Sequence, residues 1–211
     1  MKVSAVIPAY NEEATIGNVI GILNNIPTIS EVIVVSDGST DNTPAIAKNM
    51  RAKVIEYSEN RGKGAAIKAA IEVCEGDVIL FLDADLIGLK EEHVYKLLMP
   101  VIYDKADMTV GVFTNGRFST NFSHKVSPKL SGQRAVKKFV LDTMKDADLA
   151  GYGIEVLLNN HAKEMKIRVE KIELYGMTHV MKEEKFGVFR GFFHRMKMYW
   201  QILKGLRLAK R

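Results

Sequence analysis

An alternation of short apolar runs with helical patterns over the first half of the chain is the feature that most restricts its fold. The apolar runs have the length of buried strands and cover residues 3–7, 31–35, 53–57, 78–82 and 108–112. Between them, apolar residues recur at the spacing of helical turns. Strands that alternate with helices predict an α/β fold in which a mainly parallel sheet lies between helices.

Local signals help to place the helices. Thr43 followed by Pro44 is typical of an N-cap with proline at the first helical position. The second half of the chain is less regular than the first. The other expected elements are helices over 63–74, 91–105, 132–145 and 153–165, a strand over 167–174 and a polar loop over 115–128.

The size of the chain and its single cysteine limit its class. A chain of 211 residues fits one domain with a substantial core. No apolar stretch approaches the ~20 residues needed to cross a bilayer, and the apolar run at the N-terminus is too short for a signal peptide. Cys74 excludes an internal disulfide and is expected to be a small buried side chain. The expected location is therefore the cytoplasm.

Polar motifs follow the first four strands at the points where these strands end. They cover residues 8–13, 36–43, 60–64 and 83–86. In an open parallel sheet, ligands bind in the crevice beyond the carboxyl ends of the strands. Four polar strand ends at one edge therefore predict a binding site there.

Asp83 and Asp85 are the most informative pair in these motifs. Two carboxylates at positions i and i+2 of a strand end can face the same way, and Mg²⁺ or Mn²⁺ takes one or two such ligands together with phosphate oxygens. An isolated triplet of this kind is usually a solvated acidic turn, but this one stands among the other motifs. Residues 62–66 open a helix whose free N–H groups, with Lys63 or Arg61, would suit a phosphate group, although glycines before a helix more often only form a turn.

The motifs at 8–13, 36–43 and 83–86 resemble, in order and spacing, the signature of GT-A-fold glycosyltransferases of the family 2 type. Ser36 departs from the usual pattern, which has an aspartate there. The resemblance implies one GT-A domain over 1–211, with 1–112 as its nucleotide-sugar-binding half. It further implies that the donor site consists of Pro8, Tyr10, Glu12, Asp37, Lys63, Asp83 and Ala84, with Asp85 on the metal.

The motifs at 130–135 and 151–155 and the late His179 resemble the glucosyl-3-phosphoglycerate synthases and mannosylglycerate synthases. The resemblance implies that His179 joins Asp85 as a metal ligand and that Glu155 lies near the reacting carbon of the sugar. An ordinary histidine and a carboxylate that favours a helix dipole are the competing interpretations. The acceptor or sugar side, within 113–184, would consist of Ser131, Gly132, Gln133 and Tyr152.

The end of the chain carries its excess of positive charge. Residues 185–211 hold eight Lys or Arg and no acidic residue, whereas the net charge of the whole chain is +5. The body of the protein is therefore slightly acidic, which argues against a nucleic-acid-binding face. Aromatic residues among these cations favour an amphipathic helix over 186–211 that contacts a membrane surface peripherally or forms a homodimer. A terminal helix packed on the domain is the alternative.

Together these features predict a hexosyltransferase that takes its sugar from a nucleotide sugar, with UDP-glucose favoured, and uses Mg²⁺ or Mn²⁺. The acceptor would be a small phosphorylated molecule or a lipid phosphate. Peripheral contact with the inner membrane surface would favour the lipid phosphate. Family 2 enzymes invert, whereas the second resemblance implies retention. Glu155 would act as base in the first case and orient the sugar in the second, with Asp85 as the other catalytic residue.

Three other classes of protein could share this kind of fold. A nucleotidyltransferase needs a phosphate loop rich in glycine and arginine after the first strand, and a dehydrogenase needs Gly-x-Gly-x-x-Gly there. Residues 8–13 contain neither pattern. A catalytically inactive module that binds nucleotide sugars, or a membrane-associated regulatory subunit, is the remaining alternative. The intact Asp83 and Asp85 argue against it.

Overall fold

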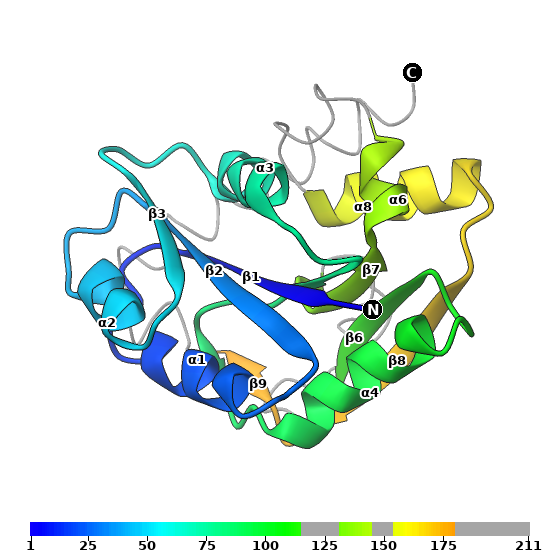
Figure 1. Ribbon diagram of the computed structural model, residues 1–211, viewed down its shortest axis with the longest axis horizontal. Helices are drawn as coiled ribbons and strands as arrows, with labels where there is room; N and C mark the ends of the chain where they lie inside the picture. Colours follow the sequence, from blue (N-terminus) through cyan, green and yellow to red (C-terminus); the bar gives the residue numbers. More distant parts are fainter. Residues whose placement is uncertain (115–130, 145–153, 180–211) are drawn as a thin grey trace.

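The computed structural model of the chain describes residues 1–114, 131–144 and 154–179 (Figure 1). The expected loop over 115–128, Tyr152 and the expected terminal helix over 186–211 lie outside these ranges. The described residues form a seven-stranded sheet in the order β3-β2-β1-β4-β7-β6-β8 and a small two-stranded sheet, β5-β9.

The first four strands of the large sheet are parallel and lie close to where the apolar runs predict them. β1 pairs with β2 on one side and with β4 on the other, and β2 pairs with β3. These strands are β1 (Val3–Ala9), β2 (Ile29–Asp37), β3 (Lys53–Tyr57) and β4 (Val78–Phe81). Their carboxyl ends share one edge of the sheet, as the sequence predicts.

The rest of the large sheet contains one reversed strand. β7 (Arg134–Lys137) lies antiparallel between β4 and β6 (Met108–Thr114), and β8 (Val169–Tyr175) runs parallel to β6 at the edge. In the small sheet, β5 (Leu86–Ile87) pairs with β9 (Thr178–His179), so residue 179 returns to the end of β4.

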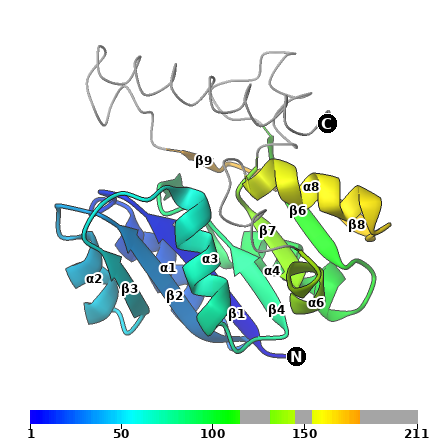
Figure 2. The same ribbon diagram turned by 90° about the horizontal axis from the view of Figure 1, so that it is seen from above.

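Helices cover both faces of the sheet, as Figures 1 and 2 show. One face carries α1 (Ile16–Asn24), α2 (Thr43–Asn49) and α4 (Glu91–Ile102), and the other carries α3 (Lys63–Val73), α6 (Lys138–Asp142) and α8 (Ile154–Glu164). The strands divide their side chains between two cores: Val34 packs with the first group of helices and Ile33 with the second. This alternation is the period-two pattern of a sheet that is buried on both faces.

The expected helix over 132–145 is wrong in its first half. Residues 134–137 form β7 instead, and only α6 is helical within the range. The segment carries apolar residues at a spacing that suits a helix, but pairing with β4 and β6 on both sides overrides this local preference. A smaller correction concerns α2, which has Asn42 as its N-cap and Thr43 as its first residue.

The expected burial of Cys74 is confirmed. Cys74 is buried at the end of α3, and burial raises the pKa of its thiol to about 11. Within the described ranges, no helix has the length and apolar character that would let it cross a membrane.

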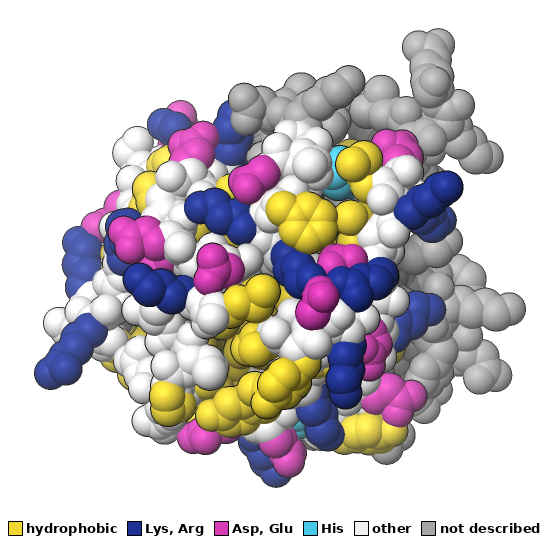
Figure 3. Space-filling view, turned by 45° about the vertical axis from the view of Figure 1, so that its right-hand side comes forward, with side chains coloured by type: hydrophobic (Ala, Val, Ile, Leu, Met, Phe, Trp, Pro, Cys, Tyr) yellow, Lys and Arg dark blue, Asp and Glu magenta, His cyan; other side chains and the backbone are white. Residues whose placement is uncertain are grey.

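The surface in Figure 3 mixes charges of both signs. Lys and Arg side chains alternate with Asp and Glu over this face, and hydrophobic side chains gather in its lower half, at the height of α1 and α4. The coloured residues of this face therefore present no basic stripe of the kind that binds a nucleic acid backbone.

Candidate active site

The loops that follow β1 and β2 are joined into one unit at the carboxyl edge of the sheet. The Asn11 amide donates to Ser39 Oγ over 3.1 Å, and the Thr40 amide donates to Asn11 Oδ1 over 2.8 Å. One residue later, the Glu12 amide donates to Thr43 Oγ1 over 2.7 Å. Tyr10, in the first of these loops, exposes 37% of its surface. The nucleoside side of the predicted site is thus held by short polar contacts between two strand ends.

Asp37 holds the start of α3. Its two carboxylate oxygens accept hydrogen bonds from the backbone amides of Arg61, at 2.7 Å, and Gly62, at 2.8 Å. The next residue, Gly38, has φ +72°, and a Cβ there would lie 2.5 Å from the backbone nitrogen of Asn60. Only glycine fits this turn without strain. The contact of Asp37 with a nucleoside stays a prediction, and its contact with the loop before α3 is an observation.

Lys63 joins three elements at the centre of the site. Its Nζ lies 2.6 Å from Asp83 Oδ1 and 2.6 Å from Glu155 Oε1. Burial by itself lowers the pKa of Lys63, but the two carboxylates outweigh this and hold it above its ordinary value. Burial likewise raises the pKa of Asp83, yet Lys63 and His179 reverse the effect and lower it to about 2. Both groups are therefore charged at neutral pH.

The segment before β7 closes over Asp83. Gln133 is fully buried, and its Nε2 donates to Asp83 Oδ2 over 2.7 Å while its Oε1 accepts from Ser131 Oγ over 3.0 Å. A Cβ on Gly132 would lie 2.6 Å from both oxygens of Asp83. Ser131, Gly132 and Gln133 thus border the site at Asp83, and Gly132 also lies next to Lys63.

Arg134 and Asn159 are the residues that sequence reasoning missed. Arg134 is 1% exposed; its Nε donates to Ser131 O over 2.9 Å, and one terminal nitrogen donates to Asn159 Oδ1 over 2.8 Å. Burial lowers the pKa of Arg134 to about 10, although Glu155 and Asp83 act in the opposite direction. Gln133 and Glu155, one residue before Arg134 and four before Asn159, carried the only signal that pointed to these positions.

Asp83, Asp85 and His179 form a group of ligand atoms that all lie within 4.8 Å of one another. His179 Nδ1 is 2.9 Å from Asp85 Oδ1, and the Phe113 ring packs against the imidazole at a centroid distance of 4.9 Å. Pairing of His179 with Leu86 across the small sheet brings it back to the Asp-x-Asp turn. Burial lowers the pKa of His179, but Asp85 and Asp83 raise it more, so that the net shift is upward.

The donor atoms suit a hard divalent cation. An octahedral ion with ligand distances of about 2.1 Å sets neighbouring ligands about 3.0 Å apart, and Asp85 and His179 offer an oxygen and a nitrogen 2.9 Å apart. The carboxylate oxygens of Asp83 and Asp85 are ligands of the kind that Mg²⁺ and Mn²⁺ prefer. The geometry is compatible with Asp85 and His179 as metal ligands, and their role stays a prediction.

Most predicted site residues lie at this one edge of the sheet. The structure brings together Lys63, Asp83, Asp85, Ser131, Gly132, Gln133, Glu155 and His179. Pro8, Tyr10 and Glu12 lie at the end of β1 and in the loop after it, and Ala84 is buried between the two aspartates. Tyr152 lies outside the described residues, so its place stays a prediction.

Comparison with known proteins finds one matching family and several similar enzymes. Residues 4–158 match the family described as Glycosyl transferase family 2. The glucosyl-3-phosphoglycerate synthase of Petrotoga mobilis is 34% identical over 110 residues, which cover 46% of this chain and 34% of the relative. The synthase of Mycobacterium tuberculosis is 29% identical over 191 residues, which cover 73% and 58%. The matches thus span about a third to just over half of these curated relatives.

Solved structures of the Mycobacterium tuberculosis synthase share the fold. Its complex with Mn²⁺, UDP-glucose and phosphoglyceric acid superposes with a TM-score of 0.71 at 27% identity and covers 84% of this chain and 71% of that one. Its complex with Mg²⁺ and UDP gives the same TM-score, identity and coverage. The likeness confirms the expected GT-A fold and the expected resemblance in the second half.

Proposed function

The chain belongs to glycosyl transferase family 2, and from that membership we propose that it transfers a hexose from a nucleotide sugar to a small phosphorylated acceptor. The observation that carries the proposal is the meeting of Lys63, Asp83 and Glu155 beside Asp85 and His179. A cation that holds two carboxylates next to a divalent metal site suits the departure of a nucleoside diphosphate.

The favoured donor is UDP-glucose. The synthase structures that share the fold are described as complexes with UDP-glucose or UDP and with Mn²⁺ or Mg²⁺. In this chain, Asp85 and His179 would hold the metal, which neutralises charge on the diphosphate as it leaves. Lys63 would add a second positive charge on the same side. Asp83 would accept hydrogen bonds from hydroxyl groups of the donor.

The acceptor is proposed to carry a phosphate group. The complex of the relative contains phosphoglyceric acid, and a lipid phosphate carries the same kind of anionic group. We assign the donor to residues 1–112 and the acceptor side to 113–184. The peripheral membrane contact or homodimer contact of residues 186–211 remains a prediction, because that segment lies outside the described residues.

Glu155 fits an orienting role better than that of a general base. Its carboxylate is engaged by Lys63 at 2.6 Å, and its side chain is 13% exposed. Removal of a proton from an acceptor hydroxyl would first require this ion pair to open. An orienting carboxylate near the sugar needs no such step, which supports the retaining course over the inverting one.

Donor binding tests the proposal first. We expect the melting temperature to rise with UDP-glucose and Mn²⁺ or Mg²⁺ together, because a ligand that binds only the native state stabilises it. The GDP and dTDP sugars serve as specificity controls. In Asp85→Ala, the metal-dependent part of the shift should vanish.

Turnover completes the test and separates an enzyme from an inactive binding module. We expect UDP release from UDP-glucose with 3-phosphoglycerate as acceptor in the wild type, and its loss in Asp85→Ala. Metal-dependent binding without turnover on any phosphorylated acceptor would support the inactive module. Failure of every nucleotide sugar to stabilise the protein would contradict both.

A further inference from the structure

Arg134 is a buried cation to which the proposed chemistry gives no role. Its side chain is 1% exposed, and its hydrogen bonds to described residues go to a backbone carbonyl, an amide oxygen and a thioether, not to a carboxylate. Its Nη2 has no hydrogen-bond partner among the described residues, whereas Nη1 donates to Asn159. A buried charge without a direct counter-ion costs free energy, and an apolar side chain of similar size would usually pack as well. The position therefore calls for a role beyond packing.

The two strong bonds of Arg134 connect the two halves of the site. Its Nε binds Ser131 O, at the start of the segment whose Gln133 amide holds Asp83. One terminal nitrogen binds Asn159 Oδ1 at 2.8 Å. Asn159 follows Glu155 by four residues on α8, so the two side chains lie on the same helix face.

The charges around Arg134 point the same way. Asp83 and Glu155 are the two carboxylates whose fields act on its guanidinium. Arg134, Lys63 and Glu155 also line one small cavity together with Gly132. Lys63 contacts both carboxylates directly. Arg134 is a second cation that interacts with them electrostatically.

We propose that Arg134 is a positioning residue that sets the place of Glu155 relative to the Asp83–Lys63 pair by joining residues 131–133 to α8. The inference rests on the proposed function and deepens it. The planar guanidinium matters because it aims two nitrogens at two acceptors in fixed directions, whereas a lysine ammonium has no such fork. A shift of about 1 Å in a site of this kind can cost about a hundredfold in rate.

Four variants test the proposal in the full-length chain. Arg134→Lys keeps the charge without the fork, Asn159→Leu removes the acceptor, and Asn159→Asp restores an acceptor of the same shape. Leu141→Ala is the matched control, because Leu141 is buried in the same core and its side chain takes no part in the hydrogen bonds of the site. All are assayed below the melting temperature of the least stable variant.

We expect kcat to fall about 10- to 100-fold in Arg134→Lys and Asn159→Leu, while the Kd for UDP with Mn²⁺ changes less than about twofold. Asn159→Asp should keep at least a third of the wild-type kcat, roughly, as should Leu141→Ala. Hydrogen exchange of Ile154–Glu164 gives a readout without turnover: it should accelerate in Arg134→Lys and Asn159→Leu and stay slow in Asn159→Asp.

The outcomes separate this inference from the proposed function. Wild-type kcat in Arg134→Lys and Asn159→Leu would overturn the inference alone, as would a loss in Leu141→Ala equal to theirs. An inactive wild type would contradict the proposed function, and the exchange rates of α8 would then still test the tie. If Arg134→Lys does not fold, the contrast between Asn159→Leu and Asn159→Asp decides.

Discussion

Gly132 lies so close to Asp83 that a side chain at its place would displace Asp83 or Lys63. A Cβ there would lie 2.6 Å from both carboxylate oxygens and 2.7 Å from Lys63 Nζ. Real Cβ atoms essentially never approach this closely, so either the carboxylate or the ammonium would have to move. The cost of a substitution therefore falls on the site itself and much less on the core.

Gly132→Ala should lower turnover by about a hundredfold, because a displacement of even about 1 Å in a reactive constellation has that effect. The melting temperature should change little. Gly21→Ala, within α1, is the control. A Cβ at Gly21 would meet only Met50 Cε, at 3.5 Å, and the substitution should raise stability by about 0.4–1 kcal/mol. Steady-state kinetics and thermal unfolding check both. Full activity of Gly132→Ala would mean that the close contact is not needed.

The single residues of the site differ in how far the sequence could reveal them. Asp83, Asp85 and Lys63 were predictable, because they follow strands whose apolar runs are plain in the sequence. Glu155 and His179 were reached only through family resemblance, since they meet the first group across 92 and 94 residues of chain. Arg134 could not be predicted, because its role depends on being buried between a strand and a helix that are not neighbours in sequence.

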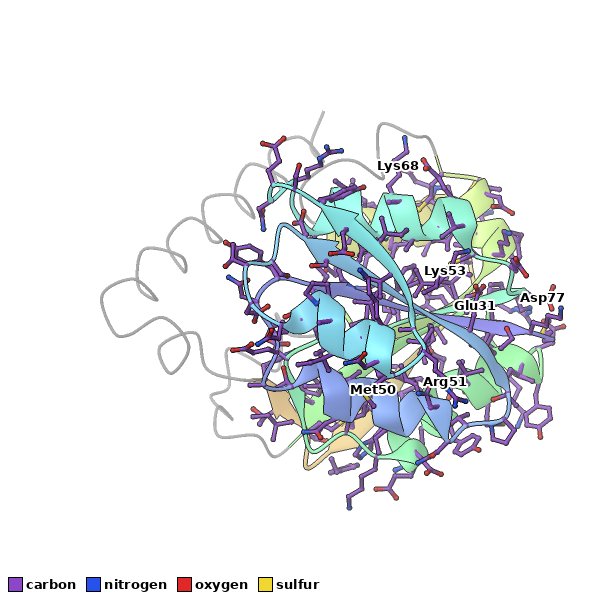
Figure 4. All side chains as sticks on the ribbon, turned by 60° about the vertical axis from the view of Figure 1, so that its left-hand side comes forward. Glu31, Met50, Arg51, Lys53, Lys68 and Asp77 are labelled. Carbon is purple, nitrogen blue, oxygen red and sulfur yellow. The ribbon has the colours of Figure 1, made fainter. Side chains whose placement is uncertain are left out.

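Helix α3 is fixed at both ends, and this matters because Lys63 is its first residue. Asp37 holds the loop before it. At the other end, Lys53 from β3, labelled in Figure 4, donates to Val73 O over 3.4 Å, and Lys138 donates to Cys74 O over 2.9 Å. Cations at the last carbonyls of a helix also favour its dipole.

Asp37→Asn should destabilise the protein by about 1–3 kcal/mol, because an amide has one acceptor oxygen and leaves one of the two partly buried backbone amides without its partner. Urea unfolding measures the change. Glu59→Gln, an exposed substitution near the same loop, should stay within about 0.5 kcal/mol of the wild type. Equal stability of the two variants would mean that Asp37 does not hold the start of α3.

At the level of elements, the strands were easier to predict than their order. The apolar runs located β1 to β4 and β6, because a buried parallel strand is nearly continuous in Val and Ile. The sequence instead predicts a helix where β7 lies, since these four residues have no strand pattern of their own and are extended only through pairing on both sides. Such long-range pairing leaves no local mark in the sequence.

A network of ion pairs connects three strands of the large sheet at the edge opposite the candidate site. Asp107, at the start of β6, receives hydrogen bonds from Lys137 at 2.9 Å and from Arg168 Nη2 at 2.7 Å. The bonds from Arg168, and those from Lys137, lower the pKa of Asp107 well below its usual range. The ends of β6 and β7 and the residue before β8 are thereby joined.

Stability should decline in acid between pH values of about 4 and 2, the former being near the ordinary pKa of an aspartate. Asp83 and Asp107 have lowered pKa values in the folded state, that of Asp83 at about 2. Their contribution is present above the unfolded pKa and is lost as the pH falls through the folded one. Urea midpoints from pH 6 to about 2 measure it. A decline equally steep in Asp107→Asn would exclude Asp107 as a cause.

The sheet is continuous across the proposed division into a donor half and an acceptor half. β7 pairs with β4 on one side and with β6 on the other, so the two halves share one set of backbone hydrogen bonds. A change on either side of residue 112 therefore acts on the same folding unit.

The position of β7 also sets the order in which a chain emerging from the ribosome can assemble. The strands up to β4 can pair as soon as they are made, because each finds its neighbour among earlier residues. β6 leaves the exit tunnel next but cannot join them until residues 134–137 have followed it. During that interval the open side of β4 stays unpaired, and an exposed strand edge invites association with other chains. Slow translation between β6 and β7 would lengthen this interval, and we expect it to lower the yield of folded protein.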